Sequence, residues 1–92
     1  MLKISKLDGE RNAVALRLDG SLSGVWVGEL RHLCEITLAN GEKLNIDCGG
    51  LSFSDTQGVA LMRELRRRQV DLTNCPPLLV FQLEEESAFD AL

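Results

Sequence analysis

The chain opens with two segments in which apolar residues alternate with polar or small ones, Leu2–Leu7 and Ala13–Leu18. Alternation with a period of two is typical of strands that bury one face. The polar segment between them, residues 8–12, contains an Asp-Gly pair, which is a frequent turn signal. The pattern therefore predicts an opening β-hairpin.

The spacing then becomes helical, from about Ser23 to Ala39. One stripe is spaced by three and four residues and contains Trp26, Leu30, Leu33 and Thr37, with Val27, Cys34 and Leu38 beside it. Ser23 is a preferred N-cap type, and Asn40-Gly41 suits a helix C-terminus. We therefore expect an amphipathic helix. Trp26 either packs this helix against the protein core, which we favour, or is exposed as an interface anchor.

A strand and a second helix follow. Lys43–Cys48 alternates like a short strand, and residues 49–54 are expected to be a connection. Asp55 is an N-cap type, and from Thr56 to about Gln69 the apolar residues Val59, Leu61, Met62 and Leu65 share one helical face. Basic residues lie opposite or at the helix end, where they complement the dipole, and a solvated face explains them better than a phosphate site. They are Arg63, Arg66, Arg67 and Arg68.

The C-terminal part contains a candidate strand at Val70–Leu72, a turn at residues 74–77 and a third helix, entered through proline, from Leu78 to Leu83. The tail, residues 84–92, either extends this helix or frays. The order β-β-α-β-α-β-α predicts one α/β domain over residues 1–92, with a mixed, mostly parallel sheet of about four strands and helices packed on it.

Composition narrows the classes of function. A chain of 92 residues with 45% apolar content holds one core, and its net charge of −4 argues against a general nucleic-acid binder. No apolar run approaches the roughly 20 residues that span a bilayer, and the N-terminus lacks a signal-peptide core. We expect a cytoplasmic protein without nucleic-acid partners or membrane insertion.

Cofactor, metal and enzymatic functions find little support. The three cysteines are far apart in the sequence, at Cys34, Cys48 and Cys75, and there is one histidine, His32. No disulfide, metal or cofactor is implied, and we expect the cysteines to act as small buried hydrophobes. Catalysis would need His32 with Cys34, which point in different directions on a helix, or Asp47 with Asp55. We therefore expect a binding protein, not an enzyme.

Two segments carry a family resemblance. Residues 16–22, Leu-Arg-Leu-Asp-Gly-Ser-Leu, are similar to a strand that leads into Gly-x-Leu before a first helix. Residues 44–62 are similar to a strand ending in Asp, a hydrophobic connection, and Asp-Ser-Ser-Gly before an apolar helix, matched here by Asp55-Thr56-Gln57-Gly58. In these features, over about residues 13–83, the chain resembles the STAS family, the domain of bacterial anti-sigma factor antagonists and of sulfate-transporter tails.

The resemblance implies a bacterial regulatory module that binds proteins. In antagonists of the family, a kinase that is also the anti-sigma factor phosphorylates the first hydroxyl residue after the Asp, which is Thr56 here. A phosphate there would meet free N–H groups at the helix N-terminus, and Asp55 would oppose it. Thr56 is otherwise an ordinary first-turn residue. Gln57 replaces the usual second Ser, and the chain is shorter than the family after its third helix.

Relatives with Thr at this position include stressosome components and the small STAS subunit of a lipid-transporting ABC complex, where an Asp-Thr-x-Gly stretch contacts the ATPase. The resemblance therefore leaves two partners open. One is an anti-sigma factor of the serine/threonine kinase type, and the other is a transporter ATPase, to which the chain would be an accessory subunit. A structural or homodimeric domain is a third possibility.

We expect docking through one edge, called here the docking edge, formed by Ser21 to Gly24, Ser54 to Gly58 and the outer face of the second helix. The expected partner-binding residues are Ser21, Ser23, Ser54, Asp55, Thr56, Gln57, Gly58 and Met62, with Thr56 as the switch. Gly58 is either simply tolerated in the first turn or keeps the surface low for a partner backbone.

Overall fold

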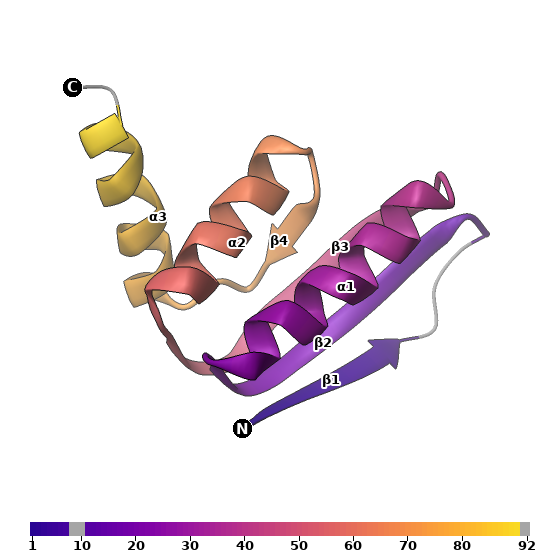
Figure 1. The fold of residues 1–92 in the computed structure, drawn as a ribbon, viewed down its shortest axis with the longest axis horizontal. Helices are drawn as coiled ribbons and strands as arrows, with labels where there is room; N and C mark the ends of the chain where they lie inside the picture. The colour runs from indigo at the N-terminus through magenta and orange to yellow at the C-terminus, as the bar shows by residue number, and fades with distance from the viewer. Residues whose placement is uncertain (8–10, 91–92) are drawn as a thin grey trace.

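Three helices and four strands follow one another in the predicted order within the part of the chain that the structure describes (Figure 1). This computed structural model describes residues 1–7 and 11–90, with residues 85–90 as helix backbone only. The elements are β1 (Leu2–Leu7), β2 (Ala13–Leu22), α1 (Val25–Ala39), β3 (Lys43–Ser54), α2 (Thr56–Arg67), β4 (Asp71–Thr73) and α3 (Pro77–Asp90). Most of the turn predicted at residues 8–12, and residues 91–92 of the tail, lie outside the described residues.

The sheet has the order β1-β2-β3-β4, and β1 is antiparallel to β2 while the other pairs are parallel. This confirms the predicted mixed sheet. Both parallel crossovers run the same way across the sheet, and right-handed crossovers then put α1 and α2 on the same face (Figure 1). Ion pairs between Arg31 and Glu64 and between Glu35 and Arg68 join the two helices.

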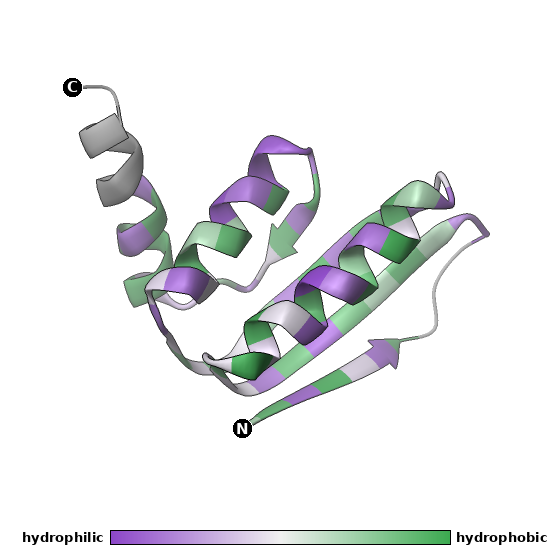
Figure 2. Ribbon diagram, viewed as in Figure 1, coloured by the Kyte–Doolittle hydropathy of each residue, from purple (hydrophilic) through white to green (hydrophobic). Residues whose placement is uncertain are grey.

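The core lies between the sheet and these helices. Alternate residues of β2 and β3 point into it, which gives the two strands their banded hydropathy in Figure 2. The fully buried side chains of the core include Leu18, Leu30, Ile46, Met62 and Leu65. The opposite sheet face is polar, and on it the Arg17 guanidinium donates to the carboxylates of Asp19 and Asp47.

Both central strands are longer than predicted, because glycines that suggested a connection lie inside them. Gly20 has a φ of 107°, and a Cβ there would lie 2.4 Å from the Met1 carbonyl oxygen. A Cβ on Gly50 would lie 2.0 Å from Oδ1 of Asp19. The β2–β3 register shifts at this irregularity and then continues until Leu22 pairs with Ser54. Residues 49–54 are thus strand, not connection.

Helix α1 begins later than predicted and buries a slightly different face. Its N-cap is Gly24, with a φ of 60°, so the prediction for Ser23 is wrong. The buried residues are Val27, Leu30, Cys34 and Thr37, whereas Leu33 is 40% exposed. Trp26 is partly buried and packs against the core, as favoured from the sequence.

The remaining elements agree closely with the sequence pattern. Asp55 caps α2, which ends at Arg67 instead of Gln69, and α3 begins at Pro77 and continues through residues 84–90. The three cysteines are free thiols, of which Cys34 and Cys48 are buried and Cys75 is partly buried. Among the described helices, none is long and apolar enough to cross a bilayer.

The orientation of α1 can be tested with two leucines of the same helix. Leu30→Ala is expected to lower the free energy of unfolding by about 2–5 kcal/mol, because Leu30 is 0% exposed and its removal leaves a cavity. Leu33→Ala should cost less than about 1 kcal/mol, since that side chain is half-exposed. Urea denaturation of both variants measures the difference. Equal losses would mean that the helix faces the sheet as the sequence stripe suggested.

Candidate partner-binding site

The site is built where two helices begin side by side. Leu22 and Ser54 are paired at the ends of neighbouring parallel strands, and each strand leads directly into a helix. The N–H groups in the first turn of a helix lack partners within the helix, and the helix dipole makes this end positive. The ends of β2 and β3 therefore bring two electropositive helix N-termini together.

Asp55 holds these helix starts in place. Its Oδ1 accepts a hydrogen bond from the Gly58 N–H at 2.7 Å, and its Oδ2 accepts one from the Gly24 N–H at 3.0 Å. Its own N–H donates to the Leu22 carbonyl at 3.1 Å. The pKa of the Asp55 carboxyl is lowered because the backbone N–H groups of Gly58 and Gly24 donate to the charged form. One side chain thus caps α2 and ties it to the start of α1.

Thr56 and Gln57 are exposed in the first turn of α2. Their side chains therefore stand in solvent at the positive end of the helix, next to the Asp55 carboxylate. A group added to the Thr56 hydroxyl needs no rearrangement of the core, and a change of charge there acts directly on the surface around it.

Gly58 is buried, and the backbone close to it belongs to this chain. A Cβ at Gly58 would lie 2.6 Å from the Leu22 carbonyl oxygen and 3.0 Å from Cγ of Leu22. Both interpretations from the sequence are therefore replaced. Gly58 is not merely tolerated in the first turn, and it does not leave room for a partner backbone. Glycine is needed because the first turn of α2 packs directly on the end of β2.

The other residues of the predicted docking edge differ in accessibility. Ser21 and Ser23 are partly exposed, whereas Ser54 is only 8% exposed. Met62 was expected to bind a partner, but it is 0% exposed and belongs to the core, so its side chain does not reach the surface. The structure brings Ser21, Ser23 and the Asp55–Gly58 segment together and separates Met62 from them.

Exposed apolar side chains near this edge were missed in the sequence. Val25, in the first turn of α1, is 79% exposed, and Phe53, two residues before Asp55, is 53% exposed. Phe53 was overlooked because its segment was interpreted as a connection, although a phenylalanine beside a candidate binding motif is itself a signal of a possible contact. Exposed apolar side chains therefore adjoin the docking edge.

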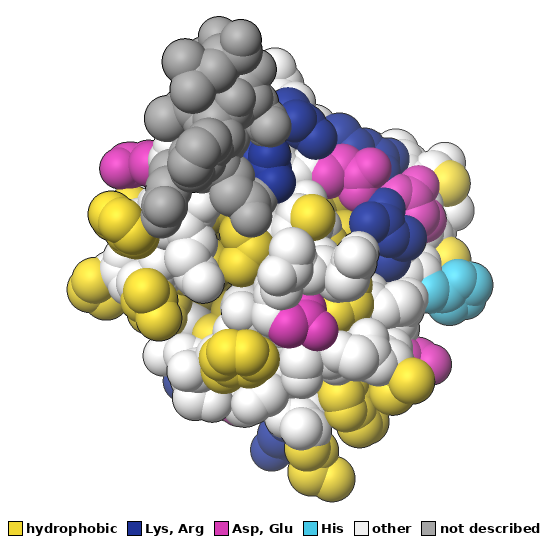
Figure 3. Space-filling model, turned by 60° about the vertical axis from the view of Figure 1, so that its left-hand side comes forward, with side chains coloured by type: hydrophobic (Ala, Val, Ile, Leu, Met, Phe, Trp, Pro, Cys, Tyr) yellow, Lys and Arg dark blue, Asp and Glu magenta, His cyan; other side chains and the backbone are white. Residues whose placement is uncertain are grey.

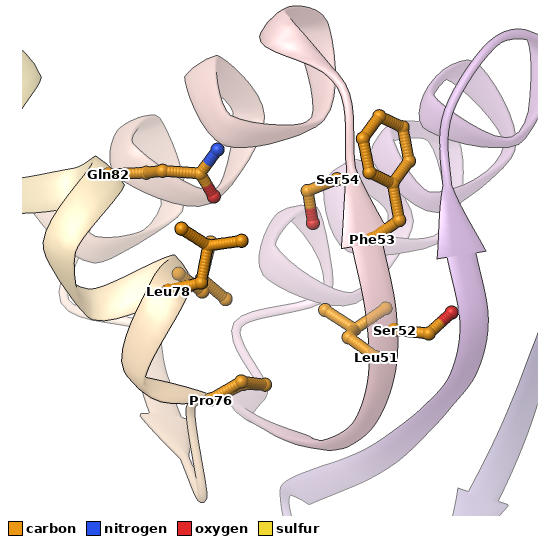
Figure 4. Close-up of a pocket in the computed structure, with 8 residues that line it drawn as sticks. Leu51, Ser52, Phe53, Ser54, Pro76, Leu78 and Gln82 are labelled. Atoms are coloured by element: carbon orange, nitrogen blue, oxygen red, sulfur yellow. The ribbon is translucent and has the colours of Figure 1, made fainter.

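A shallow groove continues from Phe53 towards α3 (Figure 4). It is lined on the β3 side by Leu51, Ser52, Phe53 and Ser54 and on the other side by Pro76, Leu78, Leu79 and Gln82. Leu78 points from α3 towards β3, and it is 62% exposed. Figure 3 shows apolar side chains gathered on this side of the molecule.

The residues considered for catalysis are not brought together. His32 is exposed, while Cys34 is 0% exposed and burial raises the pKa of its thiol to about 11. Asp47 instead accepts hydrogen bonds from the Gly49 N–H and the Asn74 amide on the polar sheet face. Within the described residues, no cluster of three or more His, Cys, Asp or Glu side chains is arranged to hold a metal ion.

Comparison with solved structures identifies the fold. The chain superimposes on the anti-sigma factor antagonist SpoIIAA, solved in its unphosphorylated form, with a TM-score of 0.70 and 25% sequence identity. The match covers 97% of this chain and 96% of that one. No family model and no curated protein sequence matches the chain. The protein thus has the STAS fold of an anti-sigma factor antagonist, which confirms the fold class and the resemblance noted in the sequence.

The role of Gly58 can be tested against a second helical glycine. Gly58→Ala is expected to destabilise the protein by about 1–3 kcal/mol, because its methyl group overlaps the Leu22 carbonyl. Gly28→Ala, in the first turns of α1, has open space around its Cβ and should stabilise by up to about 1 kcal/mol through helix propensity. Thermal and urea unfolding measure both. A neutral Gly58→Ala would contradict the close packing of α2 on β2.

Proposed function

We propose that this protein is a regulatory module of the anti-sigma factor antagonist type, which binds a partner through the docking edge and is switched by phosphorylation of Thr56. The observation that carries the proposal is the exposed Thr56, placed beside Asp55 at the meeting point of two helix N-termini within a SpoIIAA-like fold. The expected partner is a serine/threonine kinase-type anti-sigma factor, which modifies the residue that it contacts.

Electrostatics supports Thr56 as a switch. A phosphate adds about −1.5 to −2 charge at neutral pH, and at this position it lies near the positive ends of two helices, so the fold accommodates it. The Asp55 carboxylate already lies beside Thr56, and its two oxygens accept hydrogen bonds from the Gly24 and Gly58 N–H groups. Phosphorylation therefore turns a weakly charged edge into a strongly negative one. A partner surface that fits the unmodified edge loses affinity through desolvation and like-charge repulsion.

The apolar residues beside the edge support a docking role for the unmodified form. Val25 and Phe53 expose apolar surface beside the switch residue. Aromatic side chains at the centre of an interface often carry much of its binding energy, and charge placed beside them disrupts the same contact. We infer that Phe53 anchors the partner and that Thr56 controls access to it.

The switch can be tested with two neighbouring substitutions that add the same charge. Thr56→Glu is expected to weaken capture of the kinase-type partner from native extract roughly tenfold or more, equivalent to at least about 1.4 kcal/mol. Gln57→Glu is the matched control, since it is exposed in the same turn, and it should bind more tightly than Thr56→Glu. Quantitative pull-down and mass spectrometry of the partner and of residue 56 provide the measurement.

Two results would contradict the proposed switch. One is equal capture of the partner by wild type and Thr56→Glu, with both proteins folded by circular dichroism. The other is recovery of a transporter ATPase with unmodified Thr56, which would make the chain a constitutive accessory subunit. Self-association without a heterologous partner, measured by light scattering, would instead indicate a homo-oligomeric domain.

The anchor can be tested separately. Phe53→Ser is expected to weaken partner capture roughly tenfold, as removal of an aromatic hot spot does, while leaving the fold intact because the side chain is 53% exposed. Ile36→Ser removes a similarly exposed apolar side chain, 48% exposed, from the C-terminal half of α1. Capture by this control should equal that of wild type. Equal losses in the two variants would place the contact elsewhere.

A further inference from the structure

The central strand β3 and the turn that follows β4 are tightly joined. Asp47 pairs with Thr73 in the sheet, and the Thr73 hydroxyl donates to the Ile46 carbonyl at 3.3 Å. The Asn74 amide donates to the Asp47 carboxylate at 3.2 Å. Gly49 allows a still closer approach, because a Cβ there would lie 3.3 Å from Cβ of Asn74. The backbone around Cys48 and the backbone around Asn74 are therefore in contact.

The conformation of Asn74 directs the next side chain inward. Asn74 has a φ of 55°, in the left-handed region, and its side chain reaches the polar sheet face. Cys75 then packs against the hydrophobic core near the thiol of Cys48, whose pKa is raised by burial and by the nearby Cys75. Cys48 itself is 0% exposed, whereas Cys75 is partly accessible. Two thiols that are far apart in sequence thus meet at the boundary between core and solvent.

We propose that Cys48 and Cys75 form a modification site for peroxide-class oxidants, at which they close a reversible intramolecular disulfide. Cys75 attacks the peroxide first, because it is the accessible thiol; it becomes a sulfenic acid, and the peroxide leaves as water or an alcohol. The sulfur of Cys48 then attacks the sulfur of Cys75, which releases water and forms the S–S bond. Each turnover consumes one peroxide and two thiols, and an external dithiol restores both.

The burial of Cys48 favours this internal reaction over alternatives. A second protein molecule or a small thiol cannot reach a sulfur atom that is fully buried, so Cys48 reacts with its contacting neighbour. Burial and the nearby Cys75 raise the pKa of the Cys48 thiol, so the accessible Cys75 makes the first attack. Cys48 gives up its proton only in the second step, to the hydroxide that leaves the sulfur of Cys75 as water. Cys34, in α1, is 0% exposed, so an oxidant does not reach its thiol.

The bond would act on the region that carries the docking edge. The segment closed between Cys48 and Cys75 contains all of α2 and β4, including the Asp55–Gly58 segment. Pro76 and Leu78, which line the groove beside Phe53, follow Cys75 directly. Oxidation would therefore fix the start of α3 to β3 and stabilise α2 within a covalent loop. This inference does not depend on the proposed function.

The test is oxidation of the full chain with hydrogen peroxide at stoichiometric concentration, followed by intact mass and peptide mapping. Wild type and Cys34→Ala are expected to lose the mass of two hydrogens, to yield a Cys48–Cys75 cross-linked peptide, and to recover with dithiothreitol. Cys75→Ala, a mild change at a partly exposed position, should not lose this mass. The melting temperature of oxidised wild type should exceed that of the reduced form by several degrees, roughly as loop closure predicts.

Three outcomes would overturn the proposal. They are a cross-link that involves Cys34, retention of three free thiols by folded wild type after oxidation, and conversion to disulfide-linked dimers or to higher oxides of Cys75 without the internal bond. None of these results depends on whether Thr56 binds or releases a partner, so the two proposals fail or stand separately.

Discussion

The bidentate hydrogen bonding of Asp55 is the interaction on which the site depends. A single carboxylate satisfies one donor at the start of α2, through Gly58, and one at the start of α1, through Gly24. Each helix start is electropositive, and the two would repel each other without a shared negative charge. The carboxylate therefore joins two segments that are distant in sequence. The position of Thr56 thus depends on both helices and on the strands that lead into them.

That arrangement rests in turn on the glycines of the central strands. Gly50 lets β3 approach β2 across an irregular register, which brings Leu22 level with Ser54, and Gly20 lets β2 approach Met1 and Leu2. Gly58 then lets α2 pack on the Leu22 carbonyl. The positions are coupled, since a shift in the register would move the helix starts apart and leave the Asp55 oxygens without their partners. The geometry at Thr56 thus depends on backbone contacts between β2 and β3, which precede α2 in the sequence.

The sequence predicts the parts of this structure that local patterns determine. Alternation identified the hairpin and the order of elements, and residue type identified Asp55 as a cap, because a cap is a local interaction. Local patterns did not reveal that Gly49 and Gly50 continue a strand. Glycine is required there because Asn74 and Asp19, from other segments, pack closely against these two positions. For the same reason the sequence left the role of Gly58 open, since its close contact with Leu22 depends on the position of β2. Periodicity placed Met62 on the apolar face of the helix, where it is buried, and its inclusion among the partner-binding residues did not follow that pattern.

The ends of the sheet influence how another protein can approach. A sheet normally risks pairing with a foreign strand along its outermost strands, and proteins suppress this with short outer strands or with lysines. Here β4 has three residues, and β1 carries Lys3 and Lys6. Recognition by strand addition is therefore disfavoured at both edges of the sheet. A partner of the proposed kind would instead recognise shape and charge where the helices begin. Such recognition would depend on side chains, and under the proposed function a single modified hydroxyl would be sufficient to change it.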